Sequence, residues 1–173
     1  ARSVDTDARM RAGDKLWAIG DITGKGAFTH MSMYQAAVAL ADITGRDGGG
    51  PSEAEYRALP RVTFTDPEVG SVGMTEQQAR DAGLTVRTGT TDLASSSRGF
   101  THGPGAHGLI KVVEDADRGV LVGATAVGPA GGEILGFLAV AVHAEVPVAT
   151  LRSMIYAYPT FHRAIESALA ELG

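Results

Sequence analysis

The sequence predicts an α+β fold in which an antiparallel sheet is covered by helices, preceded by a shorter strand, loop and helix. In residues 58–173 the strand-like segments come mostly first and the longer helix-like segments follow, an order typical of α+β domains. Two strand-like segments, 109–113 and 120–127, flank a polar stretch and indicate an antiparallel hairpin. The glycine-rich stretch 46–57 has little to bury, and we interpret it as a linker after residues 1–45.

Residues 1–45 are expected to form a strand, a tight loop and a helix. The apolar run 16–19 ends at Gly20, and the glycine-rich residues that follow cannot continue the strand. Apolar residues then recur at helical spacing over 29–44, and Gly45 is a natural C-terminal cap.

The elements of residues 58–173 follow from caps and alternation. Thr75 with Gln78 forms a capping box for a short helix. Pro159 biases the residue before it away from helical geometry, so Thr160 is expected to cap a helix that starts directly after it. The strands are expected at 60–65, 84–91, 109–113 and 120–127, and the helices at 75–83, at 131–144, after a cap at Thr150, and at 161–172.

Composition excludes several classes of function. The 173 residues carry a net charge of -5 with no basic run, which gives no support for binding nucleic acid or an anionic membrane. The absence of cysteine excludes thiol catalysis and thiolate metal sites in this stretch, and it is compatible with the reducing cytoplasm, where we expect the protein. The polar start does not resemble a signal peptide, and the most apolar run, 134–142, is far shorter than the roughly 20 residues of a membrane span.

Two local patterns contain candidate functional residues. Asp21, which follows Gly20 at a strand end, could bind ligand hydroxyl groups or could simply cap a turn. Tyr158, His162 and Glu166 are spaced four residues apart. They could deliver a proton-transfer group on a loop, or Tyr158 could pack in the core while His162 faces water, which is the simpler interpretation.

Other candidate sites find no support. The histidines lack the spacing of metal ligands, so no metal site is predicted. The chain contains no Ser–His–acid signature, phosphate-binding loop or dinucleotide fingerprint. Taken alone, it lacks a complete active site.

Four motifs occur in an order that resembles one family. They are LWAIGD at 16–21, TH at 29–30, PRVTFTDPEVGSVGMTE at 60–76 and YPT at 158–160. Together they are similar to the C-terminal part of the pyridine nucleotide-disulfide oxidoreductases, which include dihydrolipoamide dehydrogenase, glutathione reductase, mercuric reductase and soluble transhydrogenase. The resemblance covers almost the whole chain. It implies that 1–45 is the tail of the FAD-binding domain, 46–57 a linker, and 58–173 the interface domain through which the family forms homodimers.

The resemblance also implies a cofactor site. Gly20 and Asp21 correspond to the turn whose acid binds the ribityl chain of FAD, and Phe28, Thr29 and His30 to the helix N-terminus near the flavin pyrimidine edge. In family members the FAD fingerprint, the redox cysteine pair and the domain that binds NADH or NADPH lie upstream. The chain is therefore expected to be a fragment that is not catalytically complete alone. A cofactor-free protein assembly module is the alternative.

One motif departs from the pattern of the dithiol-specific members. These carry His-Pro-Thr with a glutamate five residues after the histidine, whereas Tyr158 and Arg163 stand at those places here. A phenol is normally protonated near neutral pH, and an arginine cannot orient an imidazole as a carboxylate does. The departure disfavours dithiol chemistry and resembles the transhydrogenase and mercuric reductase branches. Tyr158 and His162 remain the candidate catalytic residues, although His162 is one helical turn out of register.

Overall fold

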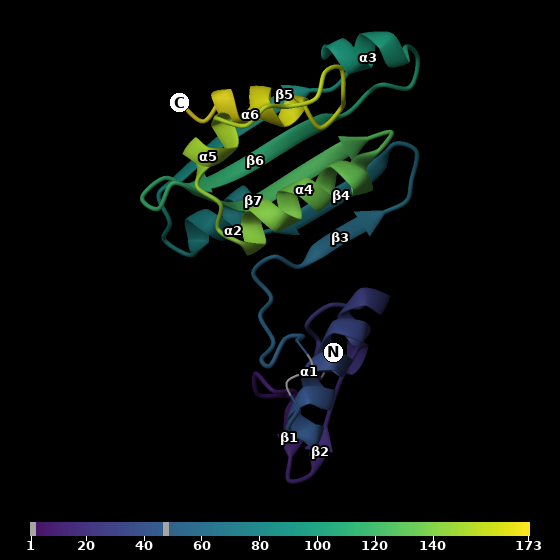
Figure 1. Ribbon diagram of the computed structural model, residues 1–173, viewed down its shortest axis with the longest axis vertical. Coiled ribbons are helices and arrows are strands. Elements are labelled where there is room, and N and C mark those ends of the chain that lie inside the picture. Colours follow the sequence, from purple (N-terminus) through teal and green to yellow (C-terminus); the bar gives the residue numbers. More distant parts are fainter. Residues whose placement is uncertain (1–2, 47–48) are drawn as a thin grey trace. The chain divides into compact units, whose positions relative to one another are not determined.

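The computed structural model describes residues 3–46 and 49–173, which form two compact units (Figure 1). The first unit ends at Tyr56 and the second begins at Arg57. None of the helices in these described ranges has the length and apolar character needed to cross a bilayer.

The first unit is a β-hairpin followed by a tight turn and a helix. Strand β1 (Arg11–Gly13) pairs antiparallel with β2 (Leu16–Trp17), and the short 3-10 turn η1 (Asp21–Thr23) leads toward α1 (Thr29–Thr44). The bounds of α1 agree with the sequence pattern. Gly45 follows with a φ of 62°, a left-handed conformation that suits glycine.

Asp42 on α1 holds the hairpin against the helix. Its carboxylate accepts hydrogen bonds from Arg11 Nε and Nη2, each at 2.6 Å, and from Trp17 Nε1 at 2.9 Å. The hydrogen bonds from Arg11 hold the pKa of Asp42 below its ordinary value. A small apolar core lies beside this contact and contains Met10, Trp17, Tyr34, Val38 and Ala39.

Residues 53–56 are attached to α1. The Tyr34 hydroxyl on α1 accepts a hydrogen bond from Glu55 N–H at 2.9 Å, and Ala54 packs against the same small core. This part of the stretch interpreted as a linker therefore belongs to the first compact unit. The domain assignment itself, with boundaries at 45 and 58, stays a prediction.

The second unit confirms the predicted α+β class with an antiparallel sheet. All five strands pair antiparallel in the order β3-β4-β7-β6-β5 (Figure 1). The predicted hairpin is formed by β6 and β7. The strands are β3 (Pro60–Thr63), β4 (Glu68–Gly73), β5 (Val86–Asp92), β6 (Leu109–Asp115) and β7 (Val120–Gly128).

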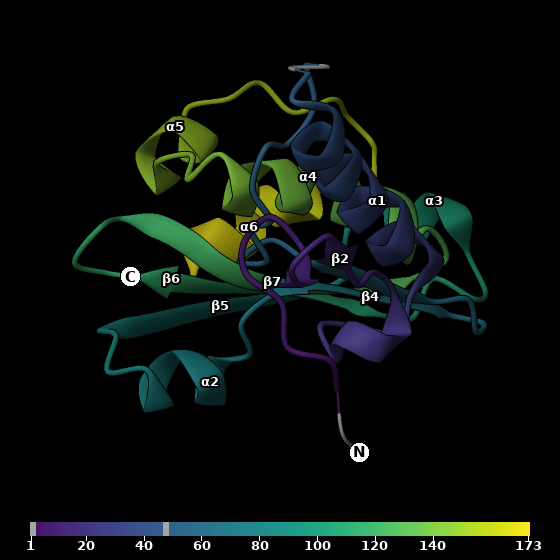
Figure 2. The same ribbon diagram turned by 90° about the horizontal axis from the view of Figure 1, so that it is seen from below.

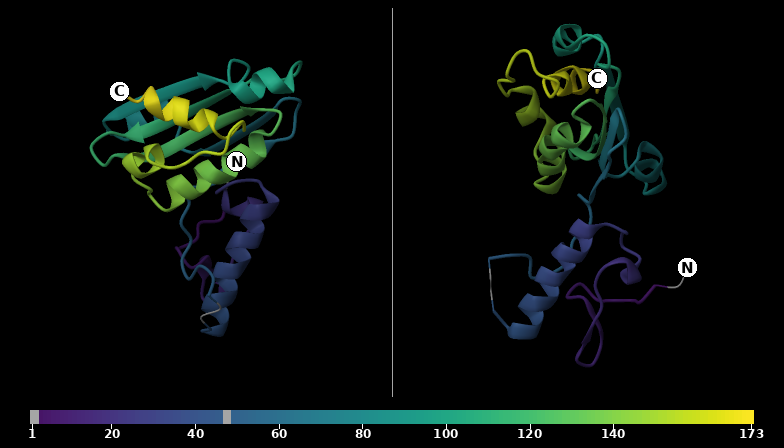
Figure 3. Two further views of the ribbon diagram at one scale, coloured as in Figure 1. Left: turned by 45° about the horizontal axis from the view of Figure 1, so that its top comes forward. Right: turned by 90° about the vertical axis from the view of Figure 1, so that its right-hand side faces the viewer.

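Three helices cover one face of this sheet. Helix α4 (Gly131–His143) packs on β4 and β7, α6 (Ala164–Ala170) packs on β5 and β6, and α5 (Val148–Arg152) contacts α6. Figures 2 and 3 show these helices on one side of the sheet and α2 (Glu76–Asp81) on the other. Helix α3 (Ser97–His102) follows β5 beyond its end.

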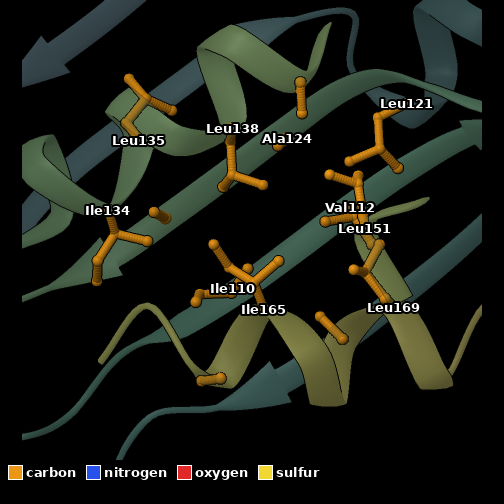
Figure 4. Close-up of a cluster of buried hydrophobic side chains, with 14 of the residues drawn as sticks. Ile110, Val112, Leu121, Ala124, Ile134, Leu135, Leu138, Leu151, Ile165 and Leu169 are labelled. Atoms are coloured by element: carbon orange, nitrogen blue, oxygen red, sulfur yellow. The ribbon is translucent and has the colours of Figure 1, made fainter. Parts of the chain in front are cut away.

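The main core fills the space between the sheet and these helices. Along β6, Ile110 and Val112 are fully buried and face the helices, while Lys111 between them is partly exposed, as the two-residue period of a strand requires. Each fully buried aliphatic side chain stabilises the fold by roughly 1.5 to 3 kcal/mol. Figure 4 shows the core residues Ile110, Val112, Leu121, Ala124, Ile134, Leu135, Leu138, Leu151, Ile165 and Leu169.

Two elements were not predicted from the sequence. Strand β4 was not among the expected strands. Its Gly70 lies close to α4, and a Cβ there would lie 3.1 Å from Gly131 O. The short helix α3 lies between the strands expected at 84–91 and 109–113, and Ser96 Oγ caps it by accepting from Gly99 N–H at 3.0 Å. Thr150 caps no helix, because α5 already begins at Val148.

Candidate functional site

The turn after β2 exposes one carboxylate. Gly20 is buried with a φ of 79°, and a Cβ at this position would lie 2.8 Å from Ser32 Oγ on α1. The turn therefore passes closely against the helix. The next residue, Asp21, is exposed, and its carboxylate makes no hydrogen bond or ion pair with any residue that the structure describes. It is available to a ligand.

The first turn of α1 presents backbone N–H groups. Phe28 is the N-cap in an extended conformation, and no side chain of a described residue caps the helix. The rings of Phe28 and His30 stack with their centroids 5.1 Å apart. The positive end of the helix dipole and its first N–H groups would favour a carbonyl or anionic oxygen. Asp21, Phe28, Thr29 and His30 are thus all in one unit, as expected for a shared ligand.

Gln35 is a residue of this region that the sequence analysis missed. It is fully buried on α1, and its Oε1 accepts a hydrogen bond from Gly20 N–H at 2.6 Å. A signal was present in the sequence, because Met31, Gln35 and Val38 share the i, i+4, i+7 spacing of the buried helix stripe.

The stretch around Thr160 differs in detail from the prediction. Helix α6 begins at Ala164, three residues later than expected, and Arg163 is its N-cap. Thr160 Oγ1 accepts from Arg163 N–H at 3.2 Å and donates to Ala157 O at 2.7 Å, so Thr160 closes a turn that precedes the helix. Phe161, directly after Thr160, is buried in the core.

Tyr158 at the tip of this stretch contacts Arg163. The side chain is 69% exposed, and the guanidinium of Arg163 lies 5.6 Å from the centre of its ring, a cation–π contact. Arg163 Nη2 forms an ion pair with Glu166 at 3.0 Å, and Nη1 donates to Tyr156 O at 3.2 Å. Tyr158 and Arg163, the two residues that differ from the dithiol motif, therefore contact each other. The carboxylate of Glu166 is paired with Arg163.

His162 lies in a different environment from Tyr158. It is half-buried, with its ring centroid 6.3 Å from that of Tyr156, and it lines a groove of about 540 Å³ with Glu133, Phe137 and Phe161. Tyr156 was not predicted to matter: it is buried, donates its hydroxyl to Leu151 O at 3.0 Å, and has a pKa raised by burial and by Glu166. Residues 3–46 and 49–173 contain no group of three or more side chains able to hold a metal.

Large apolar side chains are exposed on α4 and in the segment that precedes α6. Val140 on α4 is 64% exposed and Ile155 is 99% exposed, although both are ordinary core residues in soluble proteins. The segment 153–158 passes beside α4, where the rings of Tyr156 and Phe137 lie 6.0 Å apart. Exposed groups of this kind mark interaction surfaces. The helix-side patch consists of Val140, Met154, Ile155 and Tyr158.

Comparison with protein families and known sequences gives a consistent result. The sequence model described as pyridine nucleotide-disulphide oxidoreductase, dimerisation domain, matches residues 59–169. Dihydrolipoyl dehydrogenase of Geobacillus stearothermophilus is 33% identical over 172 residues, which are 98% of this chain and 36% of that protein. Dihydrolipoyl dehydrogenase 3 of Haloarcula marismortui is 30% identical over 166 residues, which are 95% of this chain and 34% of that protein. The chain thus spans about a third of the length of these curated relatives.

Solved structures show the same fold. LpdA from Mycobacterium tuberculosis superposes with a TM-score of 0.85 at 24% identity, covering 99% of this chain and 37% of that one. The HOCl-induced flavoprotein disulfide reductase RclA from Escherichia coli superposes with a TM-score of 0.83 at 23% identity, covering 99% of this chain and 39% of that one. At these sequence identities the similarity shows the fold alone.

Proposed function

Because the chain belongs to the pyridine nucleotide-disulphide oxidoreductase family and carries its dimerisation domain, we propose that it supplies flavin contacts and the homodimer interface of a larger FAD-dependent NAD(P)H oxidoreductase. The observation that supports the flavin contacts is the exposed Asp21 in the turn before α1, a helix whose N-cap Phe28 makes no side-chain cap hydrogen bond. By this proposal the chain is not catalytically complete alone, since the NAD(P)H site and any redox cysteines belong to the remainder of the protein.

The residues of the first unit fit FAD. A close-passing glycine, Gly20, followed by a carboxylate without a partner among the described residues suits a ligand rich in hydroxyl groups. The start of α1, at Thr29 and His30, suits a carbonyl-bearing ring edge because the positive end of the helix dipole lies there. When bound, FAD would supply hydride and electron transfer. The part of this chain is to bind and orient it, with Asp21 accepting from its hydroxyl groups and Phe28 packing beside the helix start.

Asp21→Asn is expected to raise the Kd of FAD about tenfold, because a hydrogen bond to a charged group contributes about 1.5 to 3 kcal/mol and the amide keeps only part of it. The measurement is flavin fluorescence titration of the apo form of the full-length protein. Asp14→Asn is the matched control, since Asp14 is an exposed acid in the turn between β1 and β2. An unchanged Kd would refute the role of Asp21, and a full-length protein purified with no flavin absorbance would refute the proposed function.

Tyr158 is proposed to lie near the flavin of the partner subunit without transferring a proton. Its exposure supports a contact outside its own chain, and the cation–π contact with Arg163 places a positive charge beside the ring where dithiol enzymes carry a histidine–glutamate pair. His162 is the second candidate, because it is half-buried and lines a groove together with Glu133 and with Pro159, the residue after Tyr158.

Tyr158→Phe is expected to change kcat with small electron acceptors less than about tenfold, because positioned proton transfer contributes about 10²- to 10⁴-fold and the phenol is not proposed to supply it. Stopped-flow reoxidation of the reduced flavin in the full-length enzyme measures the step. A loss of several hundred-fold would show that the phenol transfers a proton. The same loss in His162→Gln alone would assign that role to His162.

The dimer interface is proposed to lie within residues 58–173 and to use the helix-side patch. The alternative function, a cofactor-free assembly module, would account for this patch. It would not explain the close turn at Gly20 and the exposed carboxylate of Asp21. We place the complete protein in the cytoplasm as part of the same proposal, supported by the absence of cysteine from these residues.

A further inference from the structure

Gln35 is a buried amide at the centre of the first unit. It is 0% exposed, on the stripe of α1 that also carries Val38. Its Oε1 accepts from Gly20 N–H at 2.6 Å, and its Nε2 donates to Thr23 Oγ1 at 3.2 Å and to the Tyr56 hydroxyl at 3.1 Å. One side chain therefore serves as acceptor and donor at the same time.

These bonds bracket the turn that carries Asp21. Gly20 is the residue before η1 and Thr23 is its last residue, so the amide binds both ends of the turn. The turn is closed on itself as well, because the Thr23 hydroxyl donates to Gly20 O at 2.8 Å and Thr23 N–H reaches the same oxygen at 3.0 Å. Gly24 N–H then binds Asp21 O at 3.1 Å. The backbone at Asp21 therefore has little freedom to move relative to α1 while the amide is in place.

A buried amide is a costly way to fill space. The core around it is small, and an apolar side chain such as methionine would fill the same position without the desolvation of two polar groups. An apolar side chain could neither accept the hydrogen bond from Gly20 N–H nor donate one to Thr23 Oγ1. The amide therefore serves the geometry of the turn more than the burial of the helix.

We propose that Gln35 is a positioning residue for the flavin: by fixing Gly20 and Thr23 it holds the Asp21 carboxylate at a set place beside the start of α1. This inference rests on the proposed flavin contact of Asp21. The hydrogen bond to Tyr56 extends the same network to the segment 53–56, which is itself bound to α1 through Tyr34.

The test compares Gln35→Met, Gln35→Glu and Val38→Ala in the full-length protein. Gln35→Met is expected to raise the Kd of FAD about tenfold and to alter the visible circular dichroism of bound flavin, because the turn loses hydrogen bonds at both ends. Gln35→Glu keeps an acceptor for Gly20 N–H and is expected to restore most of the affinity. Val38→Ala is the matched control, since Val38 is equally buried one turn along α1 and has no polar contact with the turn.

Affinities are compared at a temperature where far-UV circular dichroism shows every variant folded. If Gln35→Met weakens flavin binding no more than Val38→Ala does, or if Gln35→Glu fails to restore it, Gln35 only fills the core and the inference is wrong. Asp21→Asn separates this failure from that of the proposed function. A weakened Asp21→Asn with an unaffected Gln35→Met overturns the positioning role alone, whereas no effect in either overturns the flavin contact itself.

Discussion

Gly89→Ala is expected to lower the free energy of unfolding of the second unit by about 3 kcal/mol or more. Gly89 lies in β5 and faces α6, and a Cβ there would lie 1.9 Å from the backbone oxygen of Ala168 and 3.2 Å from Glu171 Cβ. A backbone carbonyl cannot rotate away as a side chain can. Helix α6 would have to lift from the sheet, and the fully buried Ile165 and Leu169 would lose their packing.

Urea unfolding followed by circular dichroism measures this loss. Gly136→Ala is the matched control, because Gly136 lies on α4 and its Cβ position has open space outside the backbone of its own helix. In a helix interior alanine is better than glycine by up to about 1 kcal/mol, so this variant is expected to be slightly more stable than the parent. Equal stabilities for the two variants would show that α6 does not pack tightly on β5.

Gly89→Ala is also expected to affect the candidate site around Tyr158. Arg163 is the N-cap of α6 and Glu166 lies within this helix. The position of α6 on the sheet therefore determines where Arg163, the residue that contacts Tyr158, is placed. Arg152 on α5 also donates to Leu169 O, at 2.6 Å from Nη2. A shift of α6 is therefore expected to release Tyr158 from Arg163 as well as to weaken the core.

Elements with a strong local signal could be predicted from the sequence. Helix α1 has an apolar stripe and a C-terminal glycine, α2 has a complete capping box, and β6 and β7 are Val-rich strands joined by a polar turn. In each case the residues that decide the structure lie within a few positions of one another. Strand β4 differs, because the close approach to its Gly70 comes from α4, which lies some sixty residues later in the chain.

The candidate site shows the same division. Asp21 could be found because a carboxylate after an apolar run and a glycine is a local pattern, and the motif order placed Phe28, Thr29 and His30 beside it. Gln35 could not be assigned a role from its neighbours alone, since a polar residue in a helix usually faces water. Its function depends on Gly20, fifteen positions away, and on Tyr56, twenty-one positions away.

Ile155→Asp is expected to raise the dissociation constant of the homodimer at least about 100-fold. Ile155 is 99% exposed, so the substitution leaves the core of its own chain untouched and costs at most about 0.5 kcal/mol of stability. A two-fold symmetric interface contains each patch residue twice, so both copies would bury an unpaired carboxylate at a cost of several kcal/mol. Sedimentation equilibrium of the full-length protein across a concentration series measures the dissociation constant.

Two controls separate the patch from a general effect of charge. Ile155→Val keeps an apolar side chain and is expected to leave the dimer intact. Thr90→Asp adds the same charge on the opposite face of the sheet, because Thr90 is exposed and follows Gly89, which faces α6. If Ile155→Asp dimerises as tightly as Thr90→Asp, the helix-side patch is not the interface. A parent protein that stays monomeric at every concentration would instead refute the homodimer, and with it the role proposed for Tyr158 at the partner's flavin.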